Sequence, residues 1–429
     1  MSSSAAGGNG RPFRGGPLIP ILFFITPLFT AASPRLAPIL LPIVAVVLMI
    51  AALRRGLPWR DLLKPNAALV ALVAVAAYAG LSAIWAADPE AALSKCALLL
   101  ATTLVVFAAS VAIPTLDADQ IRRASQAFVA GALCAAGFVA IELLTDGAIT
   151  RATMNTFPSF RPERAKHVTI HHDRVTKINL SEFNQDIAIL ALLLWPGLLA
   201  LRALPSPRRK LLSVLFFLAL AVPIAISEHD SSQVGLVASL LVLLLAWVSP
   251  RAVVRGLAIA WCLGFVLVIP LDFLAFKADL HQAKWLPMSA RARIIIWEYT
   301  AERVLEKPWL GIGADSTPAT MVKPKNPSER PKGFVIRRTT GQHAHNLFLQ
   351  SWYELGVFGV ILAAIAGAAV ALRILLLPAA GASLRRGLLH HGRRHCGFRL
   401  GYVADLADLC RRAFAPIPPH AGCTAAAAR

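Results

Sequence analysis

The polar and apolar parts of this chain meet in residues 345–359, which read His345-Asn-Leu-Phe-Leu-Gln-Ser-Trp-Tyr-Glu-Leu-Gly-Val-Phe-Gly359. A polar segment rich in Lys, Arg and Pro precedes this stretch, and an apolar run over residues 353–377 begins inside it. The run is as long as the roughly 17–25 apolar residues that a helix needs to cross a bilayer. The stretch therefore places a histidine at the border between a polar loop and a membrane-spanning helix.

The composition of the whole chain also indicates a membrane protein. Apolar residues make up 57% of the 429 residues and charged residues only 15%, far more apolar surface than one soluble core would bury. We predict an all-α, polytopic membrane bundle of about ten spans, over residues 17–33, 36–53, 67–86, 96–113, 126–144, 185–203, 211–227, 232–248, 253–272 and 353–377.

The net charge of +20 raises the question of a nucleic-acid partner, but the basic residues fall mainly in short connections between apolar runs. An excess of Lys and Arg is typical of cytoplasmic connections. Every second connection carries such residues: Arg54, Arg55, Arg60, Lys64, Arg122, Arg123, Arg202, Arg208, Arg209, Lys210, Arg251 and Arg255. The pattern predicts a cytoplasmic N-terminus, outer loops near residues 145–184 and 273–345, and no nucleic-acid partner.

Three regions of different composition follow from this pattern. Residues 1–16 are rich in Ser and Gly and are predicted to be disordered, and residues 17–377 form the membrane domain. The prolines of the first apolar run and the span that follows at once favour an uncleaved helix over a signal peptide. Residues 378–429 form an atypical basic tail, which we interpret either as the product of a frameshift near residues 380–390 that replaces the last membrane helices or as a natural cytoplasmic tail.

The larger outer loop contains its own pattern. Residues 289–305 place Ile294, Trp297, Ala301 and Val304 on one stripe and predict an amphipathic helix. Pro308-Trp-Leu-Gly-Ile-Gly313 ends that helix in a turn. The following residues, about 315–340, are rich in Pro, Lys and Arg and are predicted to form a mobile flap.

Two motifs in this loop resemble the bacterial O-antigen ligase family. One is His345-Asn346 followed by nine residues, Gly356, two residues and Gly359; the other is Arg293, Trp297, Pro308, Gly311 and Gly313 in that order. The resemblance implies a membrane glycosyltransferase of the GT-C-like type, with a groove that admits lipid from the side. It also implies inverting transfer of a saccharide from undecaprenyl pyrophosphate to a hydroxyl of the lipid A-core or another glycan acceptor. This reaction takes place at the periplasmic face of the bacterial inner membrane and needs no metal or cofactor.

Such a transfer needs a base and cations for the diphosphate. Neutral His345 suits the base, since the ordinary histidine pKa is about 6.5. Arg293 suits the diphosphate, because a guanidinium binds phosphate oxygens in a bidentate manner. Arg291 points elsewhere on the helix and is the weaker candidate. The resemblance implies a second cation from the first outer loop, where Arg174 and Lys177 are the candidates.

Neighbours of His345 complete the predicted substrate-binding set. Asn346 suits a helix N-terminus and is expected to orient the histidine backbone. Glu354, near the outer end of the helix, is expected to contact His345 or an arginine. Gly356 and Gly359 are interpreted as permitting close helix packing. His343 matches no motif and is expected to lie in a solvated loop.

Other polar clusters do not predict a metal site. His171 and His172 are adjacent, so their side chains point apart, and no spaced carboxylate or cysteine completes a ligand set. The six cysteines lack zinc or redox spacing. Glu228-His229-Asp230 occupies a position where the family often has a Ser-Arg pair, and we interpret it as a solvated turn.

Three alternative functions remain open. An O-antigen or exopolysaccharide polymerase uses the same donor, and a protein O-oligosaccharyltransferase shares the same motifs. A lipid or polysaccharide transporter would explain the spans without catalysis, but its ionisable residues would lie near the bilayer midplane and within related repeats. Here the polar residues concentrate in outer loops.

Overall fold

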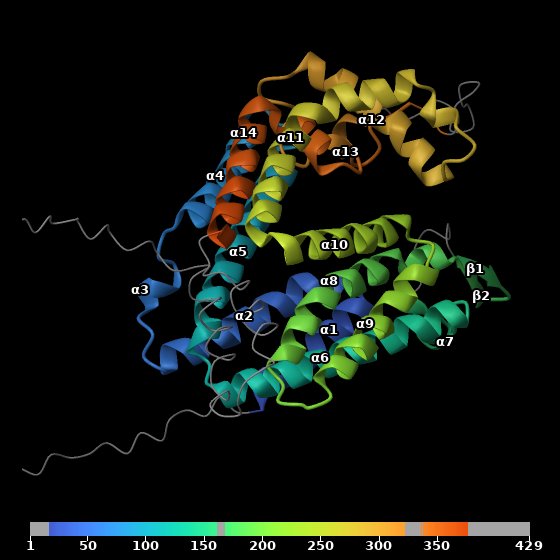
Figure 1. Ribbon diagram of the computed structural model, residues 1–429. Helices are drawn as coiled ribbons and strands as arrows, with labels where there is room; N and C mark the ends of the chain where they lie inside the picture. The colour runs from blue at the N-terminus through green and yellow to red at the C-terminus, as the bar shows by residue number, and fades with distance from the viewer. Residues whose placement is uncertain (1–16, 161–167, 322–335, 337, 376–429) are drawn as a thin grey trace, which may run out of the picture. The chain divides into compact units, whose positions relative to one another are not determined.

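The computed structural model describes residues 17–160, 168–321, 336 and 338–375, which fold as two compact units. The first unit comprises described residues up to Leu62 and Ala108–Val248, and the second comprises Leu63–Phe107 and described residues from Ser249 onward (Figure 1). The expectations for residues 1–16, for the tail after residue 378 and for most of the predicted flap fall outside the described residues.

Helices dominate both units. The first contains α1 Leu18–Ala32, α2 Ala37–Arg54, α3 Trp59–Leu62, α6 Ala118–Leu144, α7 Ala148–Thr156, β1 Val168–His171, β2 Arg174–Ile178, α8 Asn184–Arg202, α9 Arg209–Ile226 and α10 Asp230–Val248. The second contains α4 Ala67–Leu81, α11 Pro250–Lys277, α12 Met288–Glu306, α13 Thr317–Thr320 and α14 Leu347–Leu375. Helix α5 Pro89–Ala112 begins in the second unit and ends in the first. Short 3₁₀ turns occupy Pro34–Leu36, Ser82–Ile84, Ile113–Thr115, Pro158–Phe160, Leu180–Phe183 and Leu280–Gln282.

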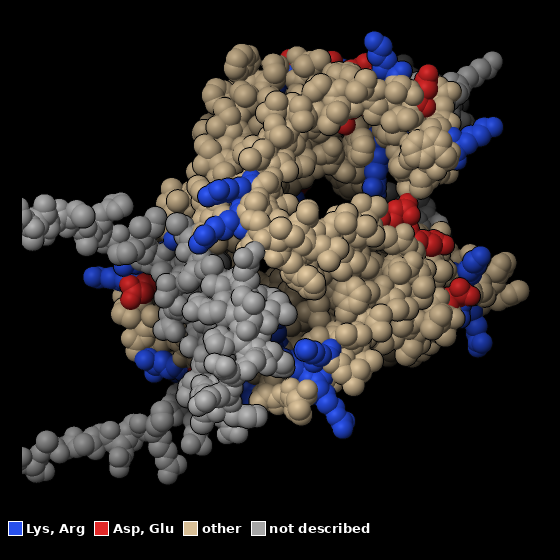
Figure 2. Space-filling view, in the orientation of Figure 1, with Lys and Arg blue, Asp and Glu red and all other residues tan. Residues whose placement is uncertain are grey.

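Nine helical segments among the described residues are long and apolar enough to cross a membrane. Together with α1, a shorter apolar helix of 15 residues, they coincide with the ten predicted runs. Their outer surfaces are strongly apolar: the exposed side chains of α10 include Val234, Val237, Leu241, Leu244 and Leu245. Figure 2 shows broad surfaces without Lys, Arg, Asp or Glu, as contact with lipid requires. The prediction of a polytopic all-α membrane protein is confirmed.

The core of the first unit lies where α6 and α8 pack against each other and against α1 and α9. Its buried side chains include Val139, Ile187, Leu190, Leu194, Leu220 and Ile224. Glycines allow two of these helix pairs to approach closely. Gly131 of α6 lies against the backbone of Phe24 in α1, and Gly197 of α8 lies under the ring of Phe216 in α9.

A two-stranded antiparallel hairpin, absent from the sequence-based expectation, lies in the first outer loop. Its turn residues His172 and Asp173 have φ values of 48° and 56°, as the two-residue hairpin turns that match strand twist require. On α7, Asn155 accepts from the N–H of Val175 at 2.7 Å and donates to its carbonyl at 3.2 Å. The loop is therefore ordered around β2, and the usual Asn-Gly signal for such a turn is replaced by His-Asp.

In the second unit α14 packs against α4 and α11. Aromatic rings fill the contact with α11: the ring centroids of Phe265 and Phe348 lie 4.8 Å apart, and Trp261 lies 5.4 Å from each. The indole of Trp261 donates to the carbonyl of Ala363 at 3.1 Å, and that of Trp352 donates to the carbonyl of Phe265 at 2.7 Å. Helices α12 and α13 lie at one end of α11 and α14 (Figure 1).

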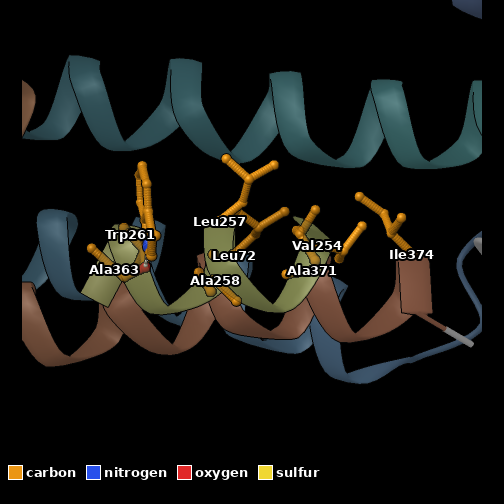
Figure 3. A pocket seen from close by; sticks show the side chains of 12 residues that line it. Leu72, Val254, Leu257, Ala258, Trp261, Ala363, Ala371 and Ile374 are labelled. Carbon is orange, nitrogen blue, oxygen red and sulfur yellow. Dashed lines mark hydrogen bonds between the residues drawn. The ribbon is translucent and has the colours of Figure 1, made fainter. Parts of the chain in front are cut away.

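An apolar groove of about 460 Å³ runs along the same three helices (Figure 3). Leu72 comes from α4, Leu257 and Trp261 from α11, and Ala363 and Ile374 from α14. Every lining residue is apolar or glycine. Such a wall suits hydrocarbon, because no polar group in it requires water.

Helix α14 is interrupted at Gly356, whose φ of 61° and ψ of −166° are not helical. A break in a membrane helix leaves backbone groups that need other partners. The Pro308–Gly313 turn supplies them: Ile312 N–H donates to the carbonyl of Tyr353 at 3.1 Å, and Gly313 N–H donates to that of Glu354 at 2.9 Å. In return, Val357 N–H donates to the carbonyl of Pro308 at 2.9 Å.

The end of α4 and the short turn after it complete this pairing. The hydroxyl of Tyr78 donates to the carbonyl of Leu355 at 3.1 Å, and the hydroxyl oxygen of Ser82 accepts from Ala314 N–H at 2.9 Å. Ala314 is buried. The break is therefore a fixed feature, held from both α4 and the turn.

Gly356 serves a different purpose from the predicted helix packing. A Cβ at Gly356 would overlap the carbonyl of Trp309, and one at Gly311 would lie 2.5 Å from the carbonyl of Glu354. Gly356 thus allows a turn, and not a second helix, to touch the broken helix. At Gly359 the nearest atoms to such a Cβ belong to Leu355, one turn earlier in α14.

Gly356→Ala is expected to destabilise the protein, because alanine there would combine backbone strain of about 1–3 kcal/mol with a steric overlap. We expect a lower melting temperature and a lower yield of monodisperse protein in detergent. Gly256→Ala, in α11 with nothing within 4 Å of its Cβ position, is the matched control. Equal stability of the two variants would contradict the role given to Gly356.

Candidate active site

Helix α12 presents one buried face and one polar face. Ile294, Ile295, Ala301 and Val304 are buried, and Trp297 is half-buried. The predicted amphipathic helix is confirmed, and its stripe faces α11 and α14. Arg293, one turn before Trp297, consequently lies near the loop that leads into α14.

That loop is held at Ala344, whose side chain is fully buried. The indole N–H of Trp297 donates to the carbonyl of Ala344 at 2.8 Å. The N–H of Ala344 donates to Oε1 of Gln350 at 2.6 Å. Both backbone polar groups of Ala344 are therefore bound by side chains, one from α12 and one from α14.

The histidines on either side of Ala344 form a pair. The ring centroids of His343 and His345 lie 4.0 Å apart in an edge-to-face arrangement. His345 has a φ of 52°, a left-handed conformation that is uncommon outside glycine, asparagine and aspartate. His343 was expected to be a solvated loop residue; it is exposed but also in contact with His345.

The pKa of His345 is lowered from its ordinary value of 6.5. Loss of water around the ring contributes most, followed by repulsion of the protonated form by His343 and by Arg293. Part of the side chain remains exposed. At neutral pH the imidazole is therefore predominantly neutral, and one ring nitrogen can accept a proton.

Asn346 begins α14. Its Oδ1 accepts from Phe348 N–H at 3.1 Å and from Leu349 N–H at 3.4 Å. These are backbone donors that a helix start leaves without intrahelical partners. The geometry agrees with the helix-start interpretation of Asn346, and both bonds engage its Oδ1.

The contacts of Glu354 differ from those expected from the sequence. Its carboxylate accepts from Gln350 Nε2 at 2.6 Å, from Thr317 Oγ1 at 2.7 Å and from Asp315 N–H at 2.9 Å. These partners belong to α14 and to the start of α13, and the expected partners, His345 or an arginine, are not among them. The carboxylate fixes residues 315–317, so this part of the predicted flap is ordered.

Arg338 joins the far end of the predicted flap to α12. Its Nη2 lies 2.6 Å and 2.7 Å from the two carboxylate oxygens of Glu298 and 2.9 Å from Oε2 of Glu302. Its guanidinium also lies over the rings of Tyr299 and Phe276, at 5.5 Å and 5.9 Å from their centroids. Multiple partners make this a tighter anchor than a single surface ion pair.

The two arginines of the first turns of α12 are both half-buried. Arg293 is the one whose charge acts on His345. Nε of Arg291 is buried and makes no hydrogen bond with the described residues. Nε of Arg291 is thus a donor that the described residues leave unbonded.

The remaining candidates lie in the first unit. Arg174 and Lys177 are exposed on β2. In the turn before α10, Nδ1 of His229 lies 2.8 Å from the hydroxyl of Ser232, so the predicted solvated turn has local order. Within the described part of the chain, no three His, Cys, Asp or Glu residues gather in a way that would hold a metal ion.

Residues 213–364 match the family model described as O-antigen ligase. This match supports the assignment of the chain to the O-antigen ligase family. No curated protein and no solved structure matches it. The family supports an O-antigen ligase-like activity with a lipid-linked glycan donor and a glycan acceptor, in a multi-pass protein of the bacterial inner membrane.

The O-antigen ligase match includes the segment around His345. It covers α12, the Pro308–Gly313 turn, His345 and the part of α14 that contains Gly356. Arg174 and Lys177 lie before it. The family assignment and the geometry around His345 therefore concern the same segment.

Sequence reasoning gave no role in the site to Gln350, Arg338 or Trp297. Gln350 and Arg338 carry no motif, and Trp297 was noted only as part of the apolar stripe and of the family resemblance. A usable signal for Gln350 was its polar side chain in the first turn of a membrane helix, four residues before Glu354 on the same face. Arg338 offered no comparable signal, because its partners lie 36–40 residues earlier in the chain.

Arg293→Gln is expected to raise the pKa of His345, because a neutral side chain no longer opposes protonation of the imidazole. Carbethoxylation of His345 by diethyl pyrocarbonate, followed by mass spectrometry across a pH series in detergent, reports the midpoint. We expect a midpoint below 6.5 in the unmodified chain and a higher one in the variant. Lys277→Gln, at the end of α11, serves as the charge-matched control; a midpoint that stays constant or falls in Arg293→Gln would refute the electrostatic coupling.

Proposed function

We propose that this chain is an O-antigen ligase that transfers a saccharide from undecaprenyl pyrophosphate to a hydroxyl of the lipid A-core at the periplasmic face of the inner membrane. The observation that carries the proposal is the pairing of a predominantly neutral His345 with Arg293, at the start of a membrane helix and inside the segment that matches the family.

The proposed reaction is an inverting displacement at the anomeric carbon. The acceptor oxygen forms a bond to that carbon while the bond from the carbon to the pyrophosphate oxygen breaks. His345 takes the proton of the acceptor hydroxyl, and undecaprenyl pyrophosphate leaves with the bonding electron pair. A positioned base contributes about 10²–10⁴ to such a rate, and stabilisation of the leaving charge contributes further.

Arg293 is proposed to bind the pyrophosphate, with Arg291 beside it. Both lie in the first turns of α12, where the positive end of the helix dipole also favours an anion. The buried, unbonded Nε of Arg291 supports this second role. This chemistry uses only side chains of the chain itself, and no metal is part of the proposal.

Asn346 and Glu354 are proposed to act on the protein, and not directly on substrate. Asn346 supports the start of α14 through its bonds to Phe348 and Leu349. Glu354 supports residues 315–317. Arg174 and Lys177 are proposed as further donor-binding cations, supported by their exposure on an ordered hairpin.

His345→Ala is expected to abolish restoration of long-chain lipopolysaccharide in a ligase-deficient host, and to lower the transfer rate of the purified protein about 10²–10⁴-fold, because the base is lost. Arg293→Ala is expected to abolish restoration as well. Below pH 6.5 the unmodified chain should retain activity until His345 protonates, and then lose it.

His229→Ala and Lys277→Ala, at matched membrane levels, are the controls and should restore normally. Full restoration by His345→Ala would contradict the proposed base. Transfer to a growing glycan, in place of the lipid A-core, would identify the chain as a polymerase. Transfer to a periplasmic protein would identify it as a protein O-oligosaccharyltransferase.

The hairpin cations give a separate expectation. Replacing Arg174 and Lys177 by glutamine should raise the donor KM about tenfold for each lost contact worth about 1.4 kcal/mol, while kcat changes little. Lys210→Gln, at the start of α9, is the control. An unchanged donor KM in the double variant of Arg174 and Lys177 would exclude them from donor binding.

A further inference from the structure

The loop that carries His345 has no regular secondary structure, and yet its central residue is fixed. Ala344 is fully buried, its carbonyl accepts from Trp297 at 2.8 Å and its N–H donates to Gln350 at 2.6 Å. Backbone groups in such a loop usually bond to other backbone or to water. Here a side chain from α12 binds the carbonyl and a side chain from α14 binds the N–H.

The two anchors are connected to the rest of the unit. Trp297 lies one turn after Arg293 on α12, so the same helix holds the loop and presents the cation. Gln350 also donates from Nε2 to Glu354 at 2.6 Å and to the hydroxyl of Thr317 at 2.7 Å. Gln350 thus links the loop to the ordered start of α13.

This support has a specific consequence for His345. A residue with a φ of 52° holds an uncommon conformation that persists only when its surroundings enforce it. Release of Ala344 allows the adjacent backbone to relax, and the imidazole moves with it. A displacement of about 1 Å at a catalytic group can lower a rate about 100-fold.

We propose that Trp297 and Gln350 are positioning residues for His345: by binding the carbonyl and the N–H of Ala344, they hold the His343–His345 turn beside Arg293. The proposal rests on the proposed function for its kinetic consequence. Its structural consequence, a fixed Ala344, is measured without activity.

Trp297→Phe tests the first anchor, because it keeps an aromatic ring and removes the indole donor. We expect kcat to fall about 10–100-fold with little change in donor KM, and the reactivity of His345 toward diethyl pyrocarbonate to rise. Trp261→Phe loses a comparable bond, from its indole to the carbonyl of Ala363, and should change neither quantity. Melting temperatures in detergent establish that both variants are folded.

A reciprocal exchange tests the second anchor. Gln350→Glu sets two carboxylates against each other, and we expect it to lower kcat and to speed amide hydrogen exchange in the peptide that contains Ala344. In the double variant Gln350→Glu with Glu354→Gln, the amide at position 354 can donate to the carboxylate at position 350, so one amide again faces one carboxylate. We expect this variant to regain most of the kcat and the slow exchange.

The outcomes separate the two proposals. Faster exchange and higher labelling in Trp297→Phe with unchanged kcat would overturn the positioning role, as would unchanged labelling and exchange in both single variants. If His345→Ala is fully active, the proposed base is wrong. A fall of kcat in Trp297→Phe would then have to act through another group, and positioning through His345 would be overturned as well. Failure of the double variant to recover, although folded, would overturn the part assigned to Gln350.

Discussion

The arrangement around His345 depends on the need of backbone groups near lipid for hydrogen-bond partners. Helix α14 breaks at Gly356, and the Pro308–Gly313 turn pairs with the groups on either side of the break. Because that turn follows α12 directly, the pairing fixes the end of α12 against α14. Glu354, immediately before the break, then fixes residues 315–317 by side-chain bonds. A single interruption of one helix therefore fixes the Pro308–Gly313 turn and residues 315–317 of the outer loop.

The electrostatics of the site follow from the same packing. The proposed reaction needs a neutral histidine as the base and a cation near the leaving diphosphate. These two requirements support each other here, since the positive charge of Arg293 and the limited solvent around His345 both lower the pKa of the imidazole. Arg338 does not add free positive charge to this region, because Glu298 and Glu302 pair with it.

The sequence was sufficient for the spans and for the segment that matches the family. Length and hydropathy predict the helices, because a bilayer imposes both, and the spacing from Arg293 to Gly359 indicates the family. The sequence was insufficient where a role depends on contacts between distant residues. A charge in a membrane helix is costly, so the sequence indicates a functional role for the carboxylate of Glu354. Its hydrogen-bond partners at residues 315–317, however, cannot be predicted from the residues beside it in the sequence. Gly356 fits a small-residue packing pattern equally well, and only its φ reveals the break. The hairpin was missed because His172 and Asp173 replace the usual turn residues.

Thr320 and Arg338 are each bound to a helix of the second unit. The hydroxyl of Thr320 lies 3.1 Å from that of Tyr353 in α14, and Arg338 is bound to Glu298 in α12. The free energy of closing a connection between two fixed points grows slowly, by about 0.6 kcal/mol for each doubling of its length. The described residues at the two ends therefore keep their places through their own bonds to α14 and α12, whatever the length of the chain that joins them.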